Sequence, residues 1–346
     1  MSMFASIRQH GAPVAVEIGQ TILEAALQQG VPYPHGCRSG NCGACKSRLD
    51  SGEVELSPYS EFALTDAERR DGLILACRAV PWSNVSVAWL DVDETIAHPL
   101  RHLTCRVVAL DDATHDIKLL RLAIETGGPF AFSAGQYAAL TFAGQAPRDY
   151  SMANRPDEAL LEFHIRRTAG GTASIYAAER LKRGDIVKVE GPYGASWLRE
   201  HHTGPILAIA GASGLAPVKS IVETALAAGM AQPIALYLGV RAERDLYLED
   251  HFRALAARHA NLSFIPVLSE PELGTARRRG FVHAAALGDL ADLDGAKAYL
   301  AGPPVIVEAA TRLLLERGAR REDIHADAFY TEAEKAALAA PKEAVT

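Results

Sequence analysis

The 346-residue sequence lacks several features that would assign it to a common class of protein. No run of 18 apolar residues is present, so no transmembrane helix is expected. The N-terminus has no apolar segment of the kind found in signal peptides. Excess basic charge is also missing, because 35 Lys and Arg residues stand against 42 Asp and Glu residues. The resulting net charge of −7 argues against a nucleic-acid-binding protein. We therefore expect a cytoplasmic protein that contacts neither nucleic acid nor a membrane.

Cysteine is scarce, and its placement is uneven. Five residues, an odd number, make a poor disulfide framework. Four of them follow the pattern C-x4-C-x2-C, then 31 residues, then a fourth cysteine: Cys37, Cys42, Cys45 and Cys77. This is the plant-type spacing of a [2Fe–2S] cluster, and the glycines of the first loop permit the tight turn that converging thiolates need. A zinc site, the alternative, usually pairs two short Cys-x2–4-Cys knuckles. Cys105 lies in an apolar segment and is expected to be a buried core residue.

The length favours two or three domains, and the composition divides the chain into three. Residues 1–93 contain short predicted strands and two capping boxes, Thr21 with Glu24 and Thr65 with Glu68, each of which opens a helix. The polar stretch 91–101 is interpreted as a linker.

The other two domains are predicted from the periodicity of apolar residues. Short strands split by Gly and Pro in 101–203 favour a small antiparallel barrel, and alternating strands and helices in 204–330 favour a parallel α/β sheet. The predicted barrel strands are 104–110, 118–124, 137–142, 160–166 and 186–190. The predicted α/β strands are 206–210, 234–238, 264–268 and 298–301, and the helices are 217–228, 248–259 and 304–317. Residues 331–346 are expected to form a flexible tail.

With its cysteine loop, the first domain resembles the plant-type ferredoxins, which implies a β-grasp α+β fold. In the second domain, the segment Arg148-Asp149-Tyr150-Ser151-Met152 resembles the flavin-binding motif of the ferredoxin–NADP reductase superfamily. This resemblance implies a six-stranded FAD-binding barrel. It also implies that Arg148 pairs with the flavin pyrophosphate, that Tyr150 packs on the isoalloxazine ring and that the Ser151 hydroxyl faces flavin N5. Met152 is included among the expected cofactor-binding residues.

A second segment of the barrel domain matches the same superfamily. The resemblance places cofactor-binding residues at His164, Arg166, Gly170, Gly171, Thr172 and Ser174. In the family, the Gly-Gly-x-x-Ser turn holds the pyrophosphate at a helix N-terminus, where free N–H groups and the helix dipole favour an anion. A pyrophosphate site implies FAD rather than FMN. The alternative is a glycine-rich hairpin followed by an ordinary helix cap.

The third domain lacks the G-x-G-x-x-G dinucleotide fingerprint. The turn 211–217 resembles instead the glycine-rich turn of the superfamily's NAD(P) domain, with Pro217 at the first helical position. The expected cofactor-binding residues are Gly211, Ser213, Gly214, Pro217, Gly239, Arg241, Asp245, Gly302 and Pro303. Acidic neighbours of the expected ribose site, including Glu243, favour NADH over NADPH. Ala301 replaces the family's cysteine beside the nicotinamide.

The segment Asp327-Ala328-Phe329 matches the family's acidic-x-aromatic ending, in which the aromatic residue covers the second flavin face. Phe329 fits by spacing; Tyr330 is the alternative, and both aromatics could instead anchor the last strand. We expect Ser151, Asp327 and Phe329 to be the catalytic residues.

To about residue 330, the chain resembles the ferredoxin–flavin reductase components of bacterial multicomponent oxygenases. This implies an enzyme that passes electrons from NADH to FAD, then to the [2Fe–2S] cluster, because a flavin accepts a hydride and releases single electrons. The implied partner is a terminal oxygenase, or an intermediate ferredoxin, docking at the ferredoxin domain of a monomer. Two alternatives stay open: a standalone reductase of a small molecule, and a redox-sensing protein with a vestigial flavin domain.

Overall fold

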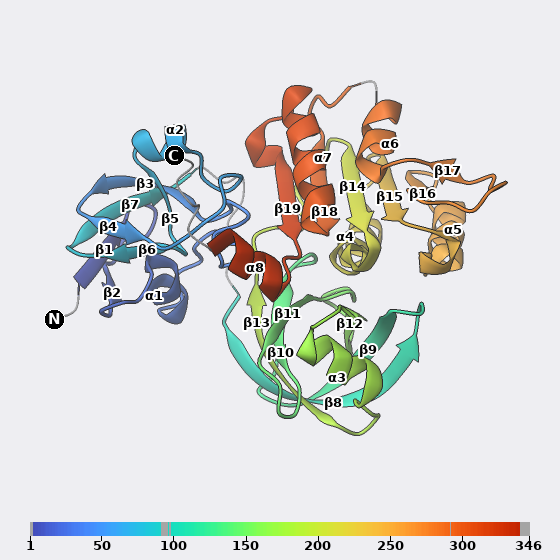
Figure 1. Cartoon of the computed structure of the whole chain (residues 1–346), viewed down its shortest axis with the longest axis horizontal. Coiled ribbons are helices and arrows are strands. Elements are labelled where there is room, and N and C mark those ends of the chain that lie inside the picture. Colours follow the sequence, from blue (N-terminus) through green and yellow to red (C-terminus); the bar gives the residue numbers. More distant parts are fainter. Residues whose placement is uncertain (1–2, 91–95, 97, 291, 340–346) are drawn as a thin grey trace. The chain divides into compact units, whose positions relative to one another are not determined.

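The computed structural model describes residues 3–90, 96, 98–290 and 292–339 (Figure 1). The chain forms two compact units. One contains the residues through Pro99 together with those from Tyr330 onward, and the other is Leu100–Phe329. Most of the expected linker, residues 91–95 and 97, lies outside the described residues.

The first unit is built on a five-stranded sheet of order β2-β1-β7-β3-β5, in which only the β1–β7 pair is parallel. A separate ribbon pairs β4 with β6. The strands are β1 Met3–Ile7, β2 Val14–Val16, β3 Lys46–Ser51, β4 Val54–Leu56, β5 Leu73–Leu75, β6 Ala79–Pro81 and β7 Val85–Trp89, and the helices are α1 Ile22–Gln28 and α2 Asp66–Arg70. Both predicted capping boxes are confirmed, since Thr21 and Thr65 each accept the N–H of the glutamate three residues on. Helix α1 buries its apolar face in this core, so the expected α+β fold is confirmed.

The second unit begins with a six-stranded antiparallel sheet of order β11-β10-β13-β8-β9-β12. A bridge between Met152 and Phe163 joins the two edges of this sheet, which therefore curls into the predicted barrel. The strands are β8 Arg101–Asp112, β9 Ile117–Thr126, β10 Tyr137–Thr141, β11 Arg148–Ser151, β12 Leu161–Arg166 and β13 Ile186–Tyr193, and helix α3 is Thr172–Glu179.

The same unit continues with a six-stranded parallel sheet of order β17-β16-β15-β14-β18-β19. Its central strand β14 is buried at every position, as a strand covered on both faces should be. The strands are β14 Ile206–Gly211, β15 Ile234–Val240, β16 Leu262–Leu268, β17 Arg278–Arg279, β18 Lys297–Gly302 and β19 Ile324–Ala328. The helices are α4 Leu215–Ala227, α5 Glu249–Arg258, α6 Val282–Asp289 and α7 Pro304–Glu316. The predicted α/β sheet is confirmed.

One local prediction is wrong. Helix α4 begins at Leu215, so Pro217 is its third residue rather than its first. A 3₁₀ turn, Ala212–Gly214, leads directly into the helix, and a proline is tolerated in the first turn because no N–H there has an intrahelical acceptor. Part of the expected tail forms helix α8, Glu332–Ala339, and residues 340–346 lie outside the described residues, so the flexibility of the tail stays a prediction. Among the helices that the structure describes, none combines the length and the apolar character needed to span a bilayer.

Candidate functional site

The cluster loop of the first unit is shaped by glycines in the left-handed region. Gly40 and Gly43 have φ values of 79° and 76°, which side chains rarely adopt. The turn directs backbone N–H groups toward cysteine sulfurs. The backbone nitrogen of Asn41 lies 3.3 Å from Cys37 Sγ, and the backbone nitrogen of Cys37 lies 3.3 Å from Cys42 Sγ. Such contacts stabilise thiolates, so the loop suits metal-bound cysteine.

The four predicted ligands come together as two pairs of thiols. Cys37 hydrogen-bonds with Cys42, and Cys77 hydrogen-bonds with Cys45. The bond from Cys42, outweighing burial, lowers the pKa of Cys37 to about 5. No group of three or more Cys, His, Asp or Glu side chains in the described part of the chain is arranged around a single metal ion. Two pairs suit a binuclear cluster, in which each iron takes two cysteines, better than one tetrahedral zinc ion.

The fifth cysteine is a core residue, as expected. Cys105 is fully buried in the barrel on strand β8, and burial raises the pKa of its thiol to about 12. An inert, protonated thiol of this kind makes no contribution to a metal site.

The predicted flavin motif forms strand β11, which pairs with β10. Sequence reasoning expected the motif but not the strand. Arg148 and Tyr150 share one face because strand side chains alternate, and Ser151 is buried on the other. The Ser151 hydroxyl donates to Asp327 Oδ2 at 3.2 Å. Phe329 lies two residues beyond Asp327, with its N–H bonded to the carbonyl of Gly302. The structure therefore brings two of the three predicted catalytic residues, Ser151 and Asp327, into contact, and Phe329 follows Asp327 closely along the chain.

Tyr330, the alternative flavin cover, belongs to the other unit. Its hydroxyl donates to the carbonyl of Asn41 in the cluster loop at 3.2 Å. Phe329 instead packs against the core of its own unit, next to strand β19. The assignment of Phe329 as the cover stays a prediction, and this separation of the two aromatics favours it.

Three predicted flavin residues have side chains that are already engaged by protein. Met152 is fully buried in the barrel core. His164 is buried between the Tyr247 hydroxyl, 3.0 Å from Nδ1, and Glu162 Oε1, 3.3 Å from Nε2. Burial lowers the pKa of His164. Arg166 donates to Asp116 at 2.9 Å. Any cofactor contact by Met152 or His164 must therefore use the backbone.

The predicted pyrophosphate turn precedes helix α3. Gly171 caps the helix without any side-chain hydrogen bond to its first N–H groups. Ser174 closes the turn by donating to the Gly171 carbonyl and accepting from the N–H of Thr168. A Cβ on Gly171 would lie 2.4 Å from Thr168 Oγ1 and 2.6 Å from Ser174 Oγ, so a larger residue would displace these hydroxyls. Gly170 has a φ of 74°, and Thr172 starts the helix. Helix N-terminal N–H groups at this turn suit an anion.

The predicted nucleotide turn lies where strands β14 and β18 end side by side. A Cβ on Gly214 would lie 2.1 Å from the carbonyl oxygen of Ala301, and one on Gly302 would lie 2.6 Å from that of Gly211. Ser213 is half-buried in the 3₁₀ turn, and Pro303 precedes helix α7. These glycines are needed because backbone meets backbone at the carboxyl ends of parallel strands, where open α/β sheets bind nucleotides.

The predicted ribose site follows strand β15. Gly239 packs against Val282, where a Cβ would lie 2.6 Å from another carbon. Asp245 is buried and accepts the N–H of Ala242 at 3.0 Å, with Arg241 Nε 3.7 Å from its carboxylate. Asp245 thus stabilises this turn, and Glu243 is the half-buried carboxylate of the turn.

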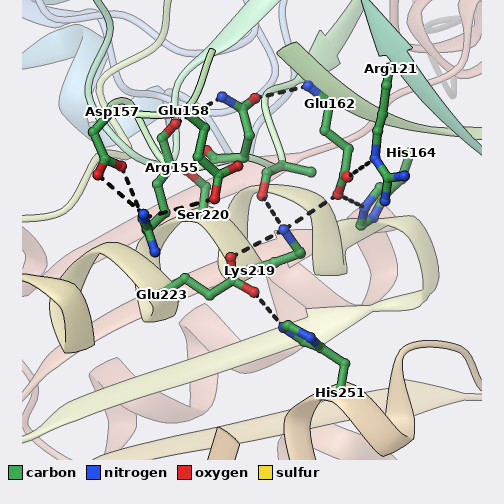
Figure 2. Close-up of polar contacts among 12 residues, drawn as sticks. Arg121, Arg155, Asp157, Glu158, Glu162, His164, Lys219, Ser220, Glu223 and His251 are labelled. Atoms are coloured by element: carbon green, nitrogen blue, oxygen red, sulfur yellow. Dashed lines mark hydrogen bonds and ion pairs between the residues drawn. The ribbon is translucent and has the colours of Figure 1, made fainter. Parts of the chain in front are cut away.

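A buried polar network was missed by sequence reasoning (Figure 2). It joins barrel residues Glu162 and His164 to Lys219, Ser220 and Glu223 of helix α4. The only sequence signal was a Lys–Glu pair at i,i+4 within an otherwise apolar helix, a pattern that usually marks a solvated face.

Comparison with known proteins assigns the class of protein. Family models match in the expected order: a 2Fe-2S iron-sulfur cluster binding domain at 7–81, an oxidoreductase FAD-binding domain at 104–197 and an oxidoreductase NAD-binding domain at 208–312. Together they define an iron–sulfur flavoprotein oxidoreductase that uses a nicotinamide cofactor.

Curated relatives share this layout over nearly the whole chain. The ferredoxin–NAD(P)+ reductase component of the naphthalene 1,2-dioxygenase system from Pseudomonas putida is 39% identical, covering 94% of this chain and 98% of its own. The reductase component of phenol 2-monooxygenase from Pseudomonas sp. CF600 is 38% identical, covering 97% of each chain. The crystal structure of an Amycolatopsis cytochrome P450 reductase has a TM-score of 0.80 at 38% identity, covering 94% of this chain and 98% of its own. The chain belongs to the ferredoxin-fused FAD reductases that serve as components of oxygenase systems.

The cofactors of this family are [2Fe–2S], FAD and NADH. NADH supplies a hydride, FAD converts the two-electron donor to single-electron transfer, and the cluster carries single electrons. The chain is thus an oxidoreductase with the expected NADH, FAD, [2Fe–2S] path.

Proposed function

We propose that this chain is the reductase component of an oxygenase system and that the ferredoxin domain docks on the oxygenase or on an intermediate ferredoxin. The observation that carries this proposal is the end-to-end similarity to reductase components of a dioxygenase system, a monooxygenase and an O-demethylase. Every one of these relatives is named for an oxygenase or demethylase system, and none for a small-molecule acceptor.

Charge supports docking at the ferredoxin domain. Residues 1–93 contain 7 Lys and Arg against 11 Asp and Glu, a net charge of −4. Glu61 is exposed and follows Ser60, which binds the cluster loop through the carbonyls of Gly40 and Asn41. An acidic side chain beside the loop would steer a basic partner surface toward the cluster.

The protein's own residues would bind and orient the cofactors. We propose that Cys37, Cys42, Cys45 and Cys77 bind the cluster. Arg148 and the N-terminus of helix α3 would hold the flavin pyrophosphate, and Ser151, oriented by Asp327 at 3.2 Å, would place its hydroxyl near flavin N5. The turns at the ends of β14 and β18 would bind NADH. No general acid or base is required, since positioning is the protein's contribution. A monomeric state stays a prediction.

The acceptor is tested by reconstitution. Purified chain and NADH are combined with the oxygenase component of the naphthalene dioxygenase system and, separately, with that of phenol hydroxylase. We expect hydroxylated product to form with at least one, coupled to NADH oxidation. Fast NADH oxidation by a quinone, with no product from either oxygenase, would support the standalone reductase instead.

The docking site is tested with cytochrome c, a basic electron acceptor. We expect Glu61→Lys to slow cytochrome c reduction about twofold to fivefold at low salt, and the difference to disappear at high salt. Glu17→Lys is the matched control, because Glu17 follows β2, at the opposite edge of the sheet from β5, after which Cys77 lies. Equal slowing by both variants would refute a local docking site.

A further inference from the structure

Two successive residues of helix α4 hold two successive carbonyls of the barrel. Lys219 Nζ donates to the carbonyl of Ala153 at 3.1 Å, and Ser220 Oγ donates to that of Asn154 at 2.6 Å. Ala153 lies two residues beyond Ser151, and Lys219 lies five residues beyond Gly214. The helix that starts at the nucleotide turn is therefore bound directly to the end of the flavin strand.

The Lys219 ammonium makes two hydrogen bonds and one further ion pair. Besides the Ala153 carbonyl, it faces Glu223 Oε2 at 3.1 Å and Glu162 Oε1 at 3.4 Å (Figure 2). The side chains of Lys219, Glu162 and Glu223 are each only 10% exposed. A buried ammonium held by two carboxylates and a carbonyl is rigid, because any displacement would leave buried charges unpaired.

Glu162, the barrel residue in this contact, is itself held by neighbouring barrel residues. Arg121 of β9 donates to Glu162 Oε2 at 2.8 Å, and the N–H of Glu162 binds Asn154 Oδ1 at 2.9 Å. Burial opposes ionisation of Glu162, but the hydrogen bond from His164 and the charge of Lys219 outweigh it, so its pKa lies well below the usual range. Glu162 is therefore a fixed anion against which Lys219 is held.

A second connection reaches the nucleotide turn itself. His164 Nδ1 lies 3.0 Å from the hydroxyl of Tyr247, and that hydroxyl lies 3.4 Å from the carbonyl of Ala212. Strand β12 thus contacts the turn after β14 through Tyr247, as well as helix α4 through Glu162. Both connections join the barrel to the segment that would carry NADH.

We propose that Lys219 and Ser220 are positioning residues for hydride transfer: they fix the nucleotide-binding helix against the flavin strand, and so set the approach of nicotinamide to flavin. The proposal rests on β11 carrying the flavin, as proposed above. Neither residue touches the reacting atoms, and a displacement of about 1 Å at a reacting centre can cost about 100-fold in rate.

The test is anaerobic stopped-flow reduction of the FAD-loaded full chain by NADH, with Lys219→Met, Lys219→Arg and Ser220→Ala. We expect Lys219→Met to lower the limiting rate of flavin reduction by about 10- to 100-fold, with the half-saturating NADH concentration changed by less than about threefold. Lys219→Arg should recover part of the rate, and Ser220→Ala should lower it by less than Lys219→Met does.

Two readouts separate positioning from general damage. The long-wavelength absorbance of nicotinamide stacked on flavin should weaken with Lys219→Met, and hydrogen exchange should quicken in peptides spanning 149–156. FAD and cluster content should stay unchanged in Lys219→Met. If this variant loses FAD, its slower reduction reflects damage to the flavin site, and the rate of flavin reduction in Ser220→Ala then tests the positioning role.

Lys297→Met is the matched control. Lys297 is equally buried and binds Asp323 at 2.8 Å, and both residues of this pair belong to the nucleotide-binding sheet domain. We expect it to destabilise the protein without slowing flavin reduction. Limiting rates within twofold of wild type for both Lys219→Met and Ser220→Ala, or equal slowing by Lys297→Met, would overturn the proposal.

Discussion

The cluster loop and the nucleotide turn are both rich in glycine, but they need glycine for different reasons. In the cluster loop, Gly40 and Gly43 adopt left-handed backbone conformations that wrap the chain around side-chain ligands. In the nucleotide turn, residue 214 must be glycine because a Cβ there would lie only 2.1 Å from the carbonyl oxygen of Ala301. One loop is defined by the thiols it presents, and the other by how closely two backbones approach.

This difference predicts how each loop responds to change. Removing a cysteine from the cluster loop removes a ligand and leaves the other unit intact. The nucleotide turn offers no single ligand to remove, so its sensitivity should lie in its glycines. Four substitutions test this contrast, from the largest expected effect to the smallest.

Cys42→Ser should abolish the [2Fe–2S] cluster, because a serine hydroxyl is a poor replacement for a thiolate. Iron content and cluster absorbance should fall to background, while FAD content stays at the wild-type value. Cys105→Ala is the control and should keep its iron, since Cys105 lies in the barrel core. A Cys42→Ser protein with a normal cluster spectrum would remove Cys42 from the ligand set.

Gly214→Ala should destabilise the second unit by about 2–3 kcal/mol, since the new Cβ overlaps the carbonyl of Ala301 and the packed backbones must move. Chemical denaturation followed by flavin fluorescence measures the change, and NADH binding should weaken with it. Gly288→Ala makes the same substitution in helix α6, where the new Cβ meets nothing within 4 Å, so it should be neutral or slightly stabilising. Equal effects from both would mean that close packing does not explain Gly214.

Gly40→Ala should lower the free energy of unfolding of the first unit by less, about 1–2 kcal/mol. Alanine is strained in the left-handed conformation, whereas the neighbouring Arg78 side chain can move aside. Heating should release the cluster about 5 °C earlier than in the wild type. Gly11→Ala, without positive φ or close neighbours, should leave the transition unchanged. A larger loss from Gly40→Ala than from Gly214→Ala would reverse the comparison.

Glu243→Lys should have the smallest effect, a gain of about twofold to fivefold in kcat/KM for NADPH, because a cation on this half-buried position replaces a carboxylate that would repel the 2′-phosphate. Activity with NADH should be nearly unchanged. Asp245→Lys is a poor test of the same idea, since Asp245 is a buried cap and its loss should destabilise the turn. An unchanged preference in Glu243→Lys would place the ribose elsewhere.

The difference between the cluster loop and the nucleotide turn also explains which features could be predicted from the sequence. Ligand spacing predicted the cluster directly, and apolar periodicity predicted the antiparallel and parallel sheets. The nucleotide turn was recognisable only by resemblance, because a close approach between Gly214 and Ala301 depends on residues far apart in the sequence. Short strands such as Val54–Leu56 and Ala79–Pro81 were missed because three residues carry too little periodicity.

The burial of Lys219 also could not be predicted from the sequence. Its pairing with Glu223 looks like an ordinary surface pair at i,i+4, and only the tertiary structure buries it against Glu162 and the carbonyl of Ala153. Long-range burial of charge leaves little mark in local sequence. A lysine in the apolar face of a helix is the single signal that could have drawn attention to it.

The central claim is the order of electron flow, and rapid anaerobic mixing of the Cys42→Ser protein with NADH tests it most directly. We expect flavin reduction at the wild-type rate together with loss of cytochrome c reduction. Full cytochrome c reduction by this cluster-free protein would show that electrons leave from the flavin, and would contradict the account.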